Sequence, residues 1–262
     1  MPDDAKPSAA GGRSSHLTFV IPAYNEIGRI GPGIATLLDY VATKPFPCDL
    51  ILVDDNSSDG TGQYVQERIG GRMPLTVLRN EPNRGKGHSV RRGMLAGTGD
   101  YVMFCDADFS TPIGETDKML VALDSGADVA IGSRGMKESD ITTHQPWWRE
   151  MPGKMFGVAV RTIALPGVRD SQCGFKFFRR EAAQAVFPLV ELERWAFDVE
   201  VLYIARQLGY SIAEVPVQWV NDPQSKVHML TDGPRMLRDI LTVKRRHRDL
   251  TRRAGDTRAA AR

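Results

Sequence analysis

Short apolar segments alternate with amphipathic ones along the first half of the chain. Apolar positions also recur at helical spacing between these segments, for instance at Ile34, Leu37, Leu38 and Val41. Strands that alternate with helices form parallel sheets with right-handed crossovers. The pattern therefore predicts an α/β fold with a Rossmann-like, mostly parallel central sheet flanked by helices. Its strands are expected at residues 17–21, 50–53, 75–78, 101–105 and 128–132.

The second half of the chain is less regular. A short strand is expected at residues 175–178 and an amphipathic helix at 197–208. Residues 211–220 read as an edge strand, because Pro216 cannot donate a hydrogen bond to a central ladder. No linker divides two cores. We expect three parts: a disordered leader (1–15), one domain (16–232) and a basic amphipathic C-terminal helix and tail (233–262).

Charge is balanced overall but concentrated at the C-terminus. The formal net charge of +2 gives no argument for a nucleic-acid partner. Residues 235–262, however, hold ten Lys or Arg and three Asp, which indicates an anionic surface as partner. The tail helix is either an interfacial helix on anionic lipid or a solvated terminal helix. Its apolar residues are Met236, Leu237, Ile240, Leu241 and Val243.

The apolar runs and the cysteines bear on the compartment. No apolar run approaches the length of about 18 residues that a membrane helix needs. Cys48, Cys105 and Cys173 are odd in number and far apart. They favour a reduced, cytosolic protein without structural zinc.

Two carboxylates follow the apolar run at 101–105. In an extended chain Asp106 and Asp108 would point the same way, at the edge where open α/β sheets bind ligands. Two close anions favour a cation, and hard oxygen ligands suit Mg²⁺ or Mn²⁺. The alternative is a solvated turn. On either reading, Thr111 and Pro112 would begin the next helix as its N-cap and first residue.

Polar clusters also follow the other strands. Tyr24 offers a ring for stacking on a base, and Glu26 and Asp55 offer acceptors for base or ribose groups. Asp54 and Asp55 could instead cap the next turn. Residues 83–87 are glycine-rich and basic and open a helix, which suits phosphate. Their spacing differs from that of P-loop NTPases, and no dinucleotide-binding glycine motif begins the chain. We interpret Arg84, Arg91 and Arg92 as solvated charges on a helix face.

Together these motifs resemble a known family. Residues 20–26 (VIPAYNE), 53–61 (VDDNSSDGT), 83–87 (NRGKG) and 106–108 (DAD) resemble, in order, the family 2 glycosyltransferases of GT-A fold. The second half resembles the group of dolichyl-phosphate glucosyltransferases and dolichyl-phosphate mannose synthases. It does so at residues 132–134 (GSR), 170–176 (DSQCGFK), 195–200 (WAFDVE) and 225–226 (SK).

The resemblance implies roles for individual residues. The nucleotide would be held by Pro22, Ala23, Tyr24, Glu26, Asp54, Asp55, Lys86, Asp106 and Ala107. A metal, Mg²⁺ or Mn²⁺, would be held by Asp106 and Asp108, and the acceptor phosphate by Arg134, Ser225 and Lys226. Asp198, Arg134 and Lys226 would be catalytic. Asp198 also stands at an expected helix start, where Asp is favoured in any case.

The implied activity is inverting transfer of a hexose from a nucleotide sugar to polyprenyl or dolichyl phosphate. Glucose from UDP-glucose is favoured, followed by mannose from GDP-mannose. A lipid phosphate oxygen is already anionic and needs cations rather than a general base. The alternatives are a soluble transferase acting on a saccharide or small-molecule hydroxyl, and a catalytically silent nucleotide-sugar-binding protein. The resemblance and the basic tail together imply a cytoplasmic protein, peripheral on the inner face of the cell membrane.

Overall fold

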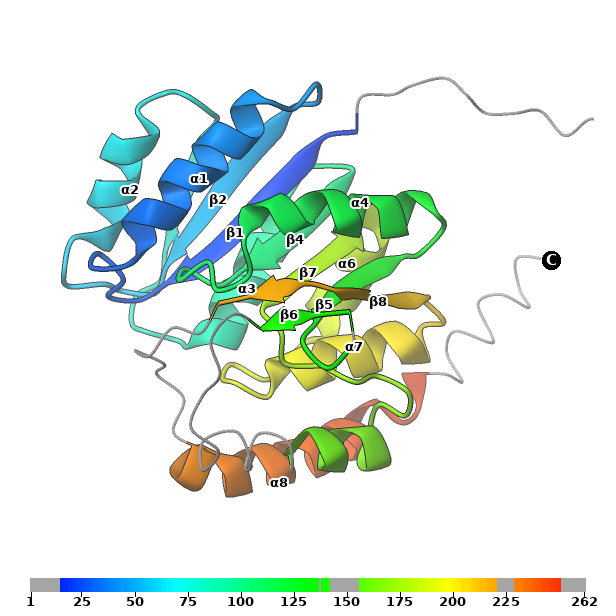
Figure 1. Ribbon diagram of the computed structural model, residues 1–262. Coiled ribbons are helices and arrows are strands. Elements are labelled where there is room, and N and C mark those ends of the chain that lie inside the picture. The colour runs from blue at the N-terminus through cyan, green and yellow to red at the C-terminus, as the bar shows by residue number, and fades with distance from the viewer. Residues whose placement is uncertain (1–14, 137, 142–155, 221–228, 251–262) are drawn as a thin grey trace, which may run out of the picture.

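A seven-stranded sheet forms the centre of the molecule in the computed structural model, which describes residues 15–136, 138–141, 156–220 and 229–250. Its strand order is β3-β2-β1-β4-β7-β5-β8 (Figure 1). The strands are β1 (Leu17–Ala23), β2 (Cys48–Asp54), β3 (Leu75–Arg79), β4 (Tyr101–Cys105), β5 (Val129–Ser133), β7 (Phe175–Arg179) and β8 (Ile212–Pro216). β6 (Asp140–Ile141) and β9 (Gln218–Trp219) form a separate parallel pair.

One strand reverses the direction of the sheet. β1 to β4 pair in parallel, as do β5 and β8, but β7 is antiparallel to both β4 and β5. The prediction of a mostly parallel sheet is therefore confirmed, with β7 as the exception. β8 lies at the edge, where Pro216 is tolerated, so the edge position was predicted correctly, but the strand ends at Pro216 and residues 218–219 form β9 instead.

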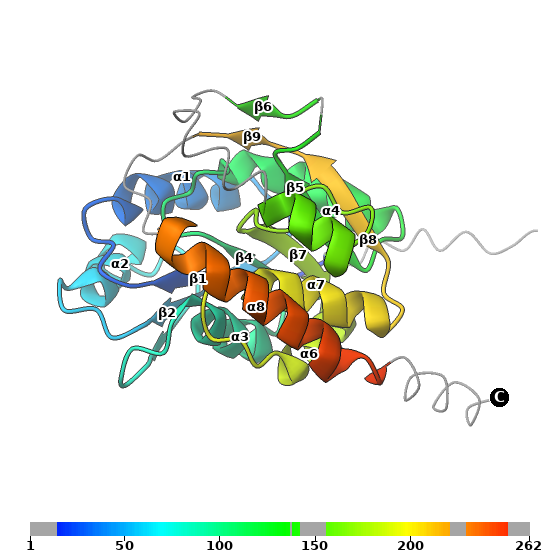
Figure 2. The same ribbon diagram turned by 90° about the horizontal axis from the view of Figure 1, so that it is seen from below.

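Helices cover both faces of the sheet (Figures 1 and 2). Strand side chains alternate between two apolar clusters, so Phe19 and Ile21 pack on one face and Val20 on the other. The first face carries α1 (Ile30–Ala42), α2 (Thr61–Ile69) and α4 (Thr116–Asp124). The second carries α3 (Lys86–Ala96), α6 (Arg180–Val186), α7 (Phe197–Gln207) and a helical stretch at residues 156–163.

The C-terminal helix α8 (Met229–His247) packs on α7. It begins four residues before the predicted start at Gly233. Ile240 and Val243 are fully buried in the same cluster as α7, so these two residues cannot insert into a lipid surface. Leu241 is exposed. Within the part of the chain that is described, no helix is both long enough and apolar enough to cross a bilayer.

The start of α4 differs from the prediction. Thr111 and Pro112 do not begin α4; Pro112 is extended, a single 3₁₀ turn (Ile113–Glu115) follows, and α4 starts at Thr116. α3 begins at Lys86 with Gly85 as its N-cap, so the glycine-rich segment at residues 83–87 leads into the first turn of the helix. The predicted leader and residues Ser225 and Lys226 lie outside the described residues, apart from Ser15.

Candidate active site

A cleft of about 450 Å³ opens where β1, β2 and β4 end. Nine of the predicted nucleotide and metal residues line it: Pro22, Ala23, Tyr24, Glu26, Asp55, Lys86, Asp106, Ala107 and Asp108. Asn83, Arg84 and Gly85 also line it and belong to the glycine-rich segment that was expected to suit phosphate. No role in the site was predicted for the other lining residues, which are Arg29, Ser89, Glu193, Arg194 and Trp195. The chain thus brings together residues that lie up to 173 positions apart, from Pro22 to Trp195.

Asp106 and Asp108 reach the cleft through a turn rather than an extended chain. The N–H of Phe109 donates to the carbonyl of Asp106 at 3.0 Å, and Phe109 has a φ of 49°. Asp108 Oδ1 accepts from the N–H of Ser110 at 3.0 Å, which fixes the second carboxylate. The expected extended geometry is therefore wrong, although both carboxylates do line the cleft.

Two cations face these carboxylates. Lys86 Nζ lies 2.6 Å from Asp106 Oδ1, and Arg29 Nη1 lies 3.7 Å from Asp108 Oδ2. Burial would lower the pKa of Lys86, but the charges of Asp106, Asp198 and Asp108 raise it above its usual value, so the ammonium stays charged. Burial and the charge of Asp106 raise the pKa of Asp108. The cleft therefore holds two ion pairs, each between a carboxylate and a cation, and a charged ligand could replace one partner in each pair.

Gly174 makes room for the Asp106 carboxylate. A Cβ at residue 174 would lie 2.2 Å from Asp106 Oδ2, which is far inside van der Waals contact. The carbonyl of Gly174 also accepts from the N–H of Asp106 at 3.2 Å. Because β7 is antiparallel to β4, the residues just before β7 meet the end of β4. This glycine therefore positions the first carboxylate.

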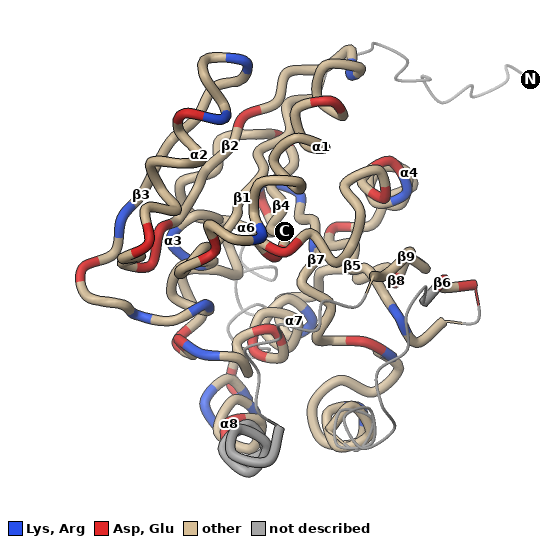
Figure 3. Tube along the Cα trace, turned by 60° about the vertical axis from the view of Figure 1, so that its left-hand side comes forward, with Lys and Arg blue, Asp and Glu red and all other residues tan. Residues whose placement is uncertain are grey.

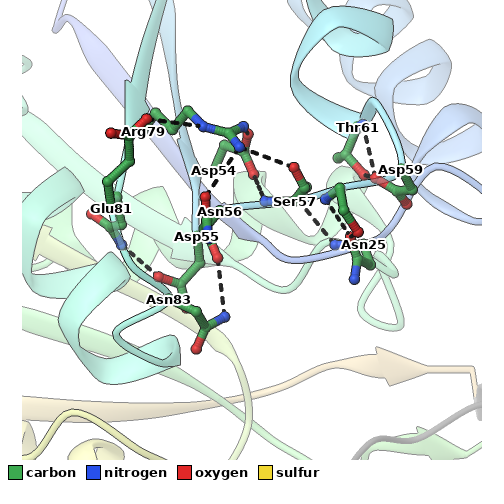
Figure 4. Close-up of polar contacts among 12 residues, drawn as sticks. Asn25, Asp54, Asp55, Asn56, Ser57, Asp59, Thr61, Arg79, Glu81 and Asn83 are labelled. Carbon is green, nitrogen blue, oxygen red and sulfur yellow. Dashed lines mark hydrogen bonds and ion pairs between the residues drawn. The ribbon is translucent and has the colours of Figure 1, made fainter.

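Asp55 holds the glycine-rich segment in place. Its carboxylate accepts from the N–H groups of Arg84 (2.9 Å) and Gly85 (2.7 Å) and from Asn80 Nδ2 (2.7 Å). Asn83 Nδ2 donates to the Asp55 carbonyl at 3.0 Å (Figure 4). Asp55 lines the cleft, but three hydrogen bonds already occupy its oxygens. Its observed contacts are structural, and they place Lys86 at the cleft.

Asp54 is not part of the cleft lining. Its carboxylate pairs with Arg79 Nη1 at 2.6 Å and accepts from the N–H of Ser57 at 2.8 Å (Figure 4). Successive strand residues point to opposite sides, so Asp54 faces away from Asp55. Asp54 therefore caps the following turn, which is the alternative that the sequence left open for it.

Residues 191–195, here called the wall segment, close one side of the cleft. The Glu193 carbonyl accepts from the N–H of Gly87 at 2.9 Å. Cβ atoms at Gly85 and Gly87 would lie 2.5 Å and 2.3 Å from backbone oxygens of this segment, so only glycine allows the contact. Arg84 pairs with the Glu193 side chain, and Lys86 Nζ lies 5.6 Å from the Trp195 ring centroid. The Arg84 side chain is 46% exposed, in agreement with a solvated charge, although it lines the cleft and precedes α3 rather than lying on the helix face.

Asp198 is buried and paired with a lysine. It is 3% exposed, is absent from the cleft lining, and forms an ion pair with the fully buried Lys176. Lys176 Nζ also donates to the Cys173 carbonyl at 2.6 Å. Burial raises the pKa of Asp198, and the charges of Lys176 and Lys86 oppose that rise. Asp198 thus acts on the cleft through its charge on Lys86.

Arg134 forms a two-pronged pair with Asp170. Its Nε and Nη2 lie 2.7 Å and 3.0 Å from the two carboxylate oxygens, and its guanidinium lies over the Trp219 ring at 5.4 Å. Burial alone would raise the pKa of Asp170, but Arg134 lowers it to about 2. Arg134 does not line the cleft described above. The other predicted acceptor residues, Ser225 and Lys226, lie outside the described residues.

The donor set of the cleft suits a divalent cation. Asp106 and Asp108 supply hard oxygen ligands, and a cation would relieve the repulsion that raises the pKa of Asp108. Among the described residues, no three His, Cys, Asp or Glu side chains form a metal site of their own. A cation held by these two aspartates would take further oxygen ligands from elsewhere, and a diphosphate supplies them.

Comparison with known proteins identifies similar chains. The family model for glycosyl transferase family 2 matches residues 18–187. A dolichyl-phosphate beta-glucosyltransferase from Dictyostelium discoideum is 34% identical over 245 residues, which is 88% of this chain and 75% of that protein. The Homo sapiens protein of the same name is 32% identical over 256 residues, 92% of this chain and 78% of that one.

Solved structures show the same fold. Mannosyl-3-phosphoglycerate synthase from Rubrobacter xylanophilus gives a TM-score of 0.66 at 20% identity, covering 90% of this chain and 75% of that one. Glucosyl-3-phosphoglycerate synthase from Mycobacterium tuberculosis, in complex with Mn²⁺, UDP and glucosyl-3-phosphoglycerate, gives 0.60 at 20% identity, covering 87% and 78%. The chain therefore has the GT-A fold.

Proposed function

Because the chain belongs to glycosyl transferase family 2, we propose that it transfers a glucosyl group from UDP-glucose to a polyprenyl or dolichyl phosphate. The observation that carries this proposal is the cleft in which Asp106, Asp108 and Lys86 meet. Such a constellation suits the diphosphate of a nucleotide sugar. The choice of glucose and of a lipid phosphate is supported by relatives named dolichyl-phosphate beta-glucosyltransferase, which match most of the chain.

The reaction makes one bond and breaks one. An anionic oxygen of the acceptor phosphate attacks the anomeric carbon, and the bond from that carbon to the diphosphate breaks. The electron pair leaves with the nucleoside diphosphate, and the configuration inverts because the oxygen attacks in line from the side opposite the leaving group. Lys86 lines the cleft and stays charged, so it is suited to stabilise the departing diphosphate. Tyr24, which is 44% exposed, is suited to stack on the base.

Asp106 and Asp108 are the residues that would hold Mg²⁺ or Mn²⁺. A bound divalent ion would neutralise negative charge on the diphosphate. The Mn²⁺ and UDP bound together in the M. tuberculosis structure support a divalent metal of this kind.

No general base is needed when the acceptor is a phosphate. Asp198 is buried and paired with Lys176, which agrees with a reaction that needs no side chain to remove a proton. Arg134 remains our candidate for the acceptor phosphate, through its charged guanidinium beside Trp219. Ser225 and Lys226 are proposed for the same role.

A lipid substrate requires access to a membrane, and α8 offers a basic surface. Arg238 and Arg245 of α8 are exposed on the side opposite Ile240 and Val243, and Arg248, directly after the helix, is exposed as well (Figure 3 marks Lys and Arg in blue). The apolar side of the helix packs on the protein, so the proposed contact is electrostatic rather than insertion. We therefore propose peripheral association with the anionic cytoplasmic face of the cell membrane.

A panel of nucleotide sugars with a short polyprenyl phosphate tests the proposal. The purified chain should transfer glucose from UDP-glucose and give a glucosyl phosphate lipid of inverted configuration. Transfer of mannose from GDP-mannose instead would change the donor but keep the reaction. Transfer only to a water-soluble hydroxyl, or nucleotide binding without turnover, would refute the proposed acceptor or the proposed catalysis.

A further inference from the structure

A buried carboxylate on α7 joins the wall segment to the C-terminal helix. Glu200 is fully buried, and its Oε2 accepts from the N–H groups of Glu191 (2.9 Å) and Leu192 (2.7 Å). Its other oxygen, Oε1, lies 2.7 Å from Nε2 of His247, the last residue of α8. One side chain therefore connects three separate parts of the chain.

The wall segment depends on this carboxylate for its order. Residues 190–193 form no helix or strand, so their backbone N–H groups need partners outside regular secondary structure. Glu200 supplies the acceptor for two of them. A buried carboxylate must itself be well satisfied, and His247, which is 5% exposed, supplies its hydrogen bond from α8, while Arg246 Nη1 lies further off, 3.9 Å from the same oxygen.

The same segment runs directly into the cleft. Glu193, Arg194 and Trp195 line the cleft, and the Glu193 carbonyl receives the N–H of Gly87 at the start of α3. The position of the wall segment therefore sets the distance between Trp195 and Lys86. A shift of residues 191 and 192 would also move Glu193, Arg194 and Trp195, which directly follow them and line the cleft.

We propose that Glu200 and His247 are positioning residues for the nucleotide-sugar cleft, so that the last turn of α8 is part of the machinery that shapes the donor site. Neither residue lines the cleft; they act by holding the wall segment against Gly85 and Gly87. The part of the inference that concerns the donor rests on the proposed function. The part that concerns the wall segment does not.

His247→Leu and Val243→Ala form a matched pair for the test. Both substitutions remove buried contacts of α8, but only the first removes the hydrogen bond to Glu200. Hydrogen exchange of residues 190–196 without ligand should become about tenfold faster in His247→Leu than in Val243→Ala. The dissociation constant for UDP-glucose should rise about five- to tenfold in His247→Leu alone. His247→Gln keeps a side-chain donor and should restore both quantities toward the wild-type values.

The outcomes separate the two parts of the inference. Equal exchange in His247→Leu and Val243→Ala would overturn the positioning role. Faster exchange with unchanged affinity for UDP-glucose would overturn its link to the donor site. A wild-type protein that binds no nucleotide sugar would refute the proposed function, while the exchange measurement would still decide whether Glu200 and His247 hold the wall segment.

Discussion

Lys86 and Asp106 form an ion pair across the cleft, with 2.6 Å between Nζ and Oδ1. Lys86 begins α3 and Asp106 follows β4, so the pair joins the glycine-rich segment to the first carboxylate of the site. In this pair the charge of the lysine neutralises that of the aspartate. A nucleotide diphosphate with a divalent cation would let the aspartate bind the metal and the lysine bind phosphate.

Replacing Lys86 should impair transfer without unfolding the protein. Lys86→Met keeps the length of the side chain but removes the charge that the diphosphate needs. We expect kcat/KM for the donor to fall about 100-fold. Steady-state kinetics measure this, with Lys118→Met as the control because Lys118 is exposed on α4. A variant with near-normal kcat/KM would exclude Lys86 from the site.

Removing Asp108 tests the metal assignment. Asp108→Ala takes away one of the two carboxylates, and we expect metal-dependent transfer to fall at least about 100-fold. The melting temperature should change little, because burial already disfavours this charge. The exposed Asp39→Ala variant is the control. Transfer that responds equally to added Mn²⁺ in the two variants would contradict the assignment.

Gly174→Ala should displace Asp106 without removing it. The added Cβ would clash with the carboxylate at 2.2 Å, so the side chain must move. A misplacement of about 1 Å at a reacting group can cost about 100-fold in rate, and we expect a loss of that order. Gly114→Ala is a matched control, since its Cβ would meet nothing within 4 Å. Equal activity in the two variants would show that Asp106 tolerates the shift.

The ion pair between Asp170 and Arg134 should make the free energy of unfolding depend on pH in the acidic range. Arg134 lowers the pKa of Asp170 to about 2 in the folded state, below its value in the unfolded chain. The stabilisation is therefore complete at a pH above the pKa that Asp170 has in the unfolded chain. It is lost as the pH falls through the pKa of Asp170 in the folded state. Asp170→Asn should lower the free energy of unfolding by about 2 kcal/mol at pH 7.

Chemical denaturation at several pH values measures this contribution. The difference between wild type and Asp170→Asn should shrink steadily from pH 5 to pH 2, as Asp170 takes up its proton. The exposed Asp39→Asn variant should show no such convergence. A difference that stays constant over this range would show that the ion pair is not its source.

Charge on α8 should govern binding to anionic vesicles. Each basic residue near such a surface contributes about 1 kcal/mol, so the double variant Arg238→Ala and Arg245→Ala should weaken binding about 30-fold at low salt. Vesicle sedimentation measures this. The double variant Arg68→Ala and Lys118→Ala removes two exposed cations from other helices. Equal loss in the two double variants would exclude α8 as the specific contact.

The gathering of polar residues at one edge of the sheet could be predicted, because it follows from the order of strands and helices along the chain. Parallel strands end on the same side, so polar residues after β1, β2 and β4 had to converge there. The turn at Asp106 could not be predicted in the same way, because it depends on Phe109 adopting a positive φ. Asp54 and Asp55 were both assigned to the nucleotide, but alternation along the strand separates them.

Other features depend on contacts that the sequence does not display. The direction of β7 is set by its neighbours, because the side-chain pattern of a five-residue strand does not show which way the strand runs in the sheet. The wall segment meets Gly87 across more than 100 residues, so only the two glycines gave a signal that some backbone approaches closely there. Lys176 offered a clearer sign, since a lysine inside the strand FKFFR has to find a buried anion.

The reversed direction of β7 determines which segment of the chain meets the cleft from the other side. Glu26, Asp55 and Asp106 lie in segments that follow parallel strands and so begin at the cleft edge of the sheet. β7 runs in the opposite direction, so the segment at this edge precedes the strand. The stretch from Asp170 to Gly174 therefore enters the cleft edge from the opposite direction, where Gly174 contacts Asp106 and Asp170 pairs with Arg134. A change in this incoming stretch would therefore reach Asp106 and Arg134 together, even where the pairing of β7 with β4 and β5 is kept.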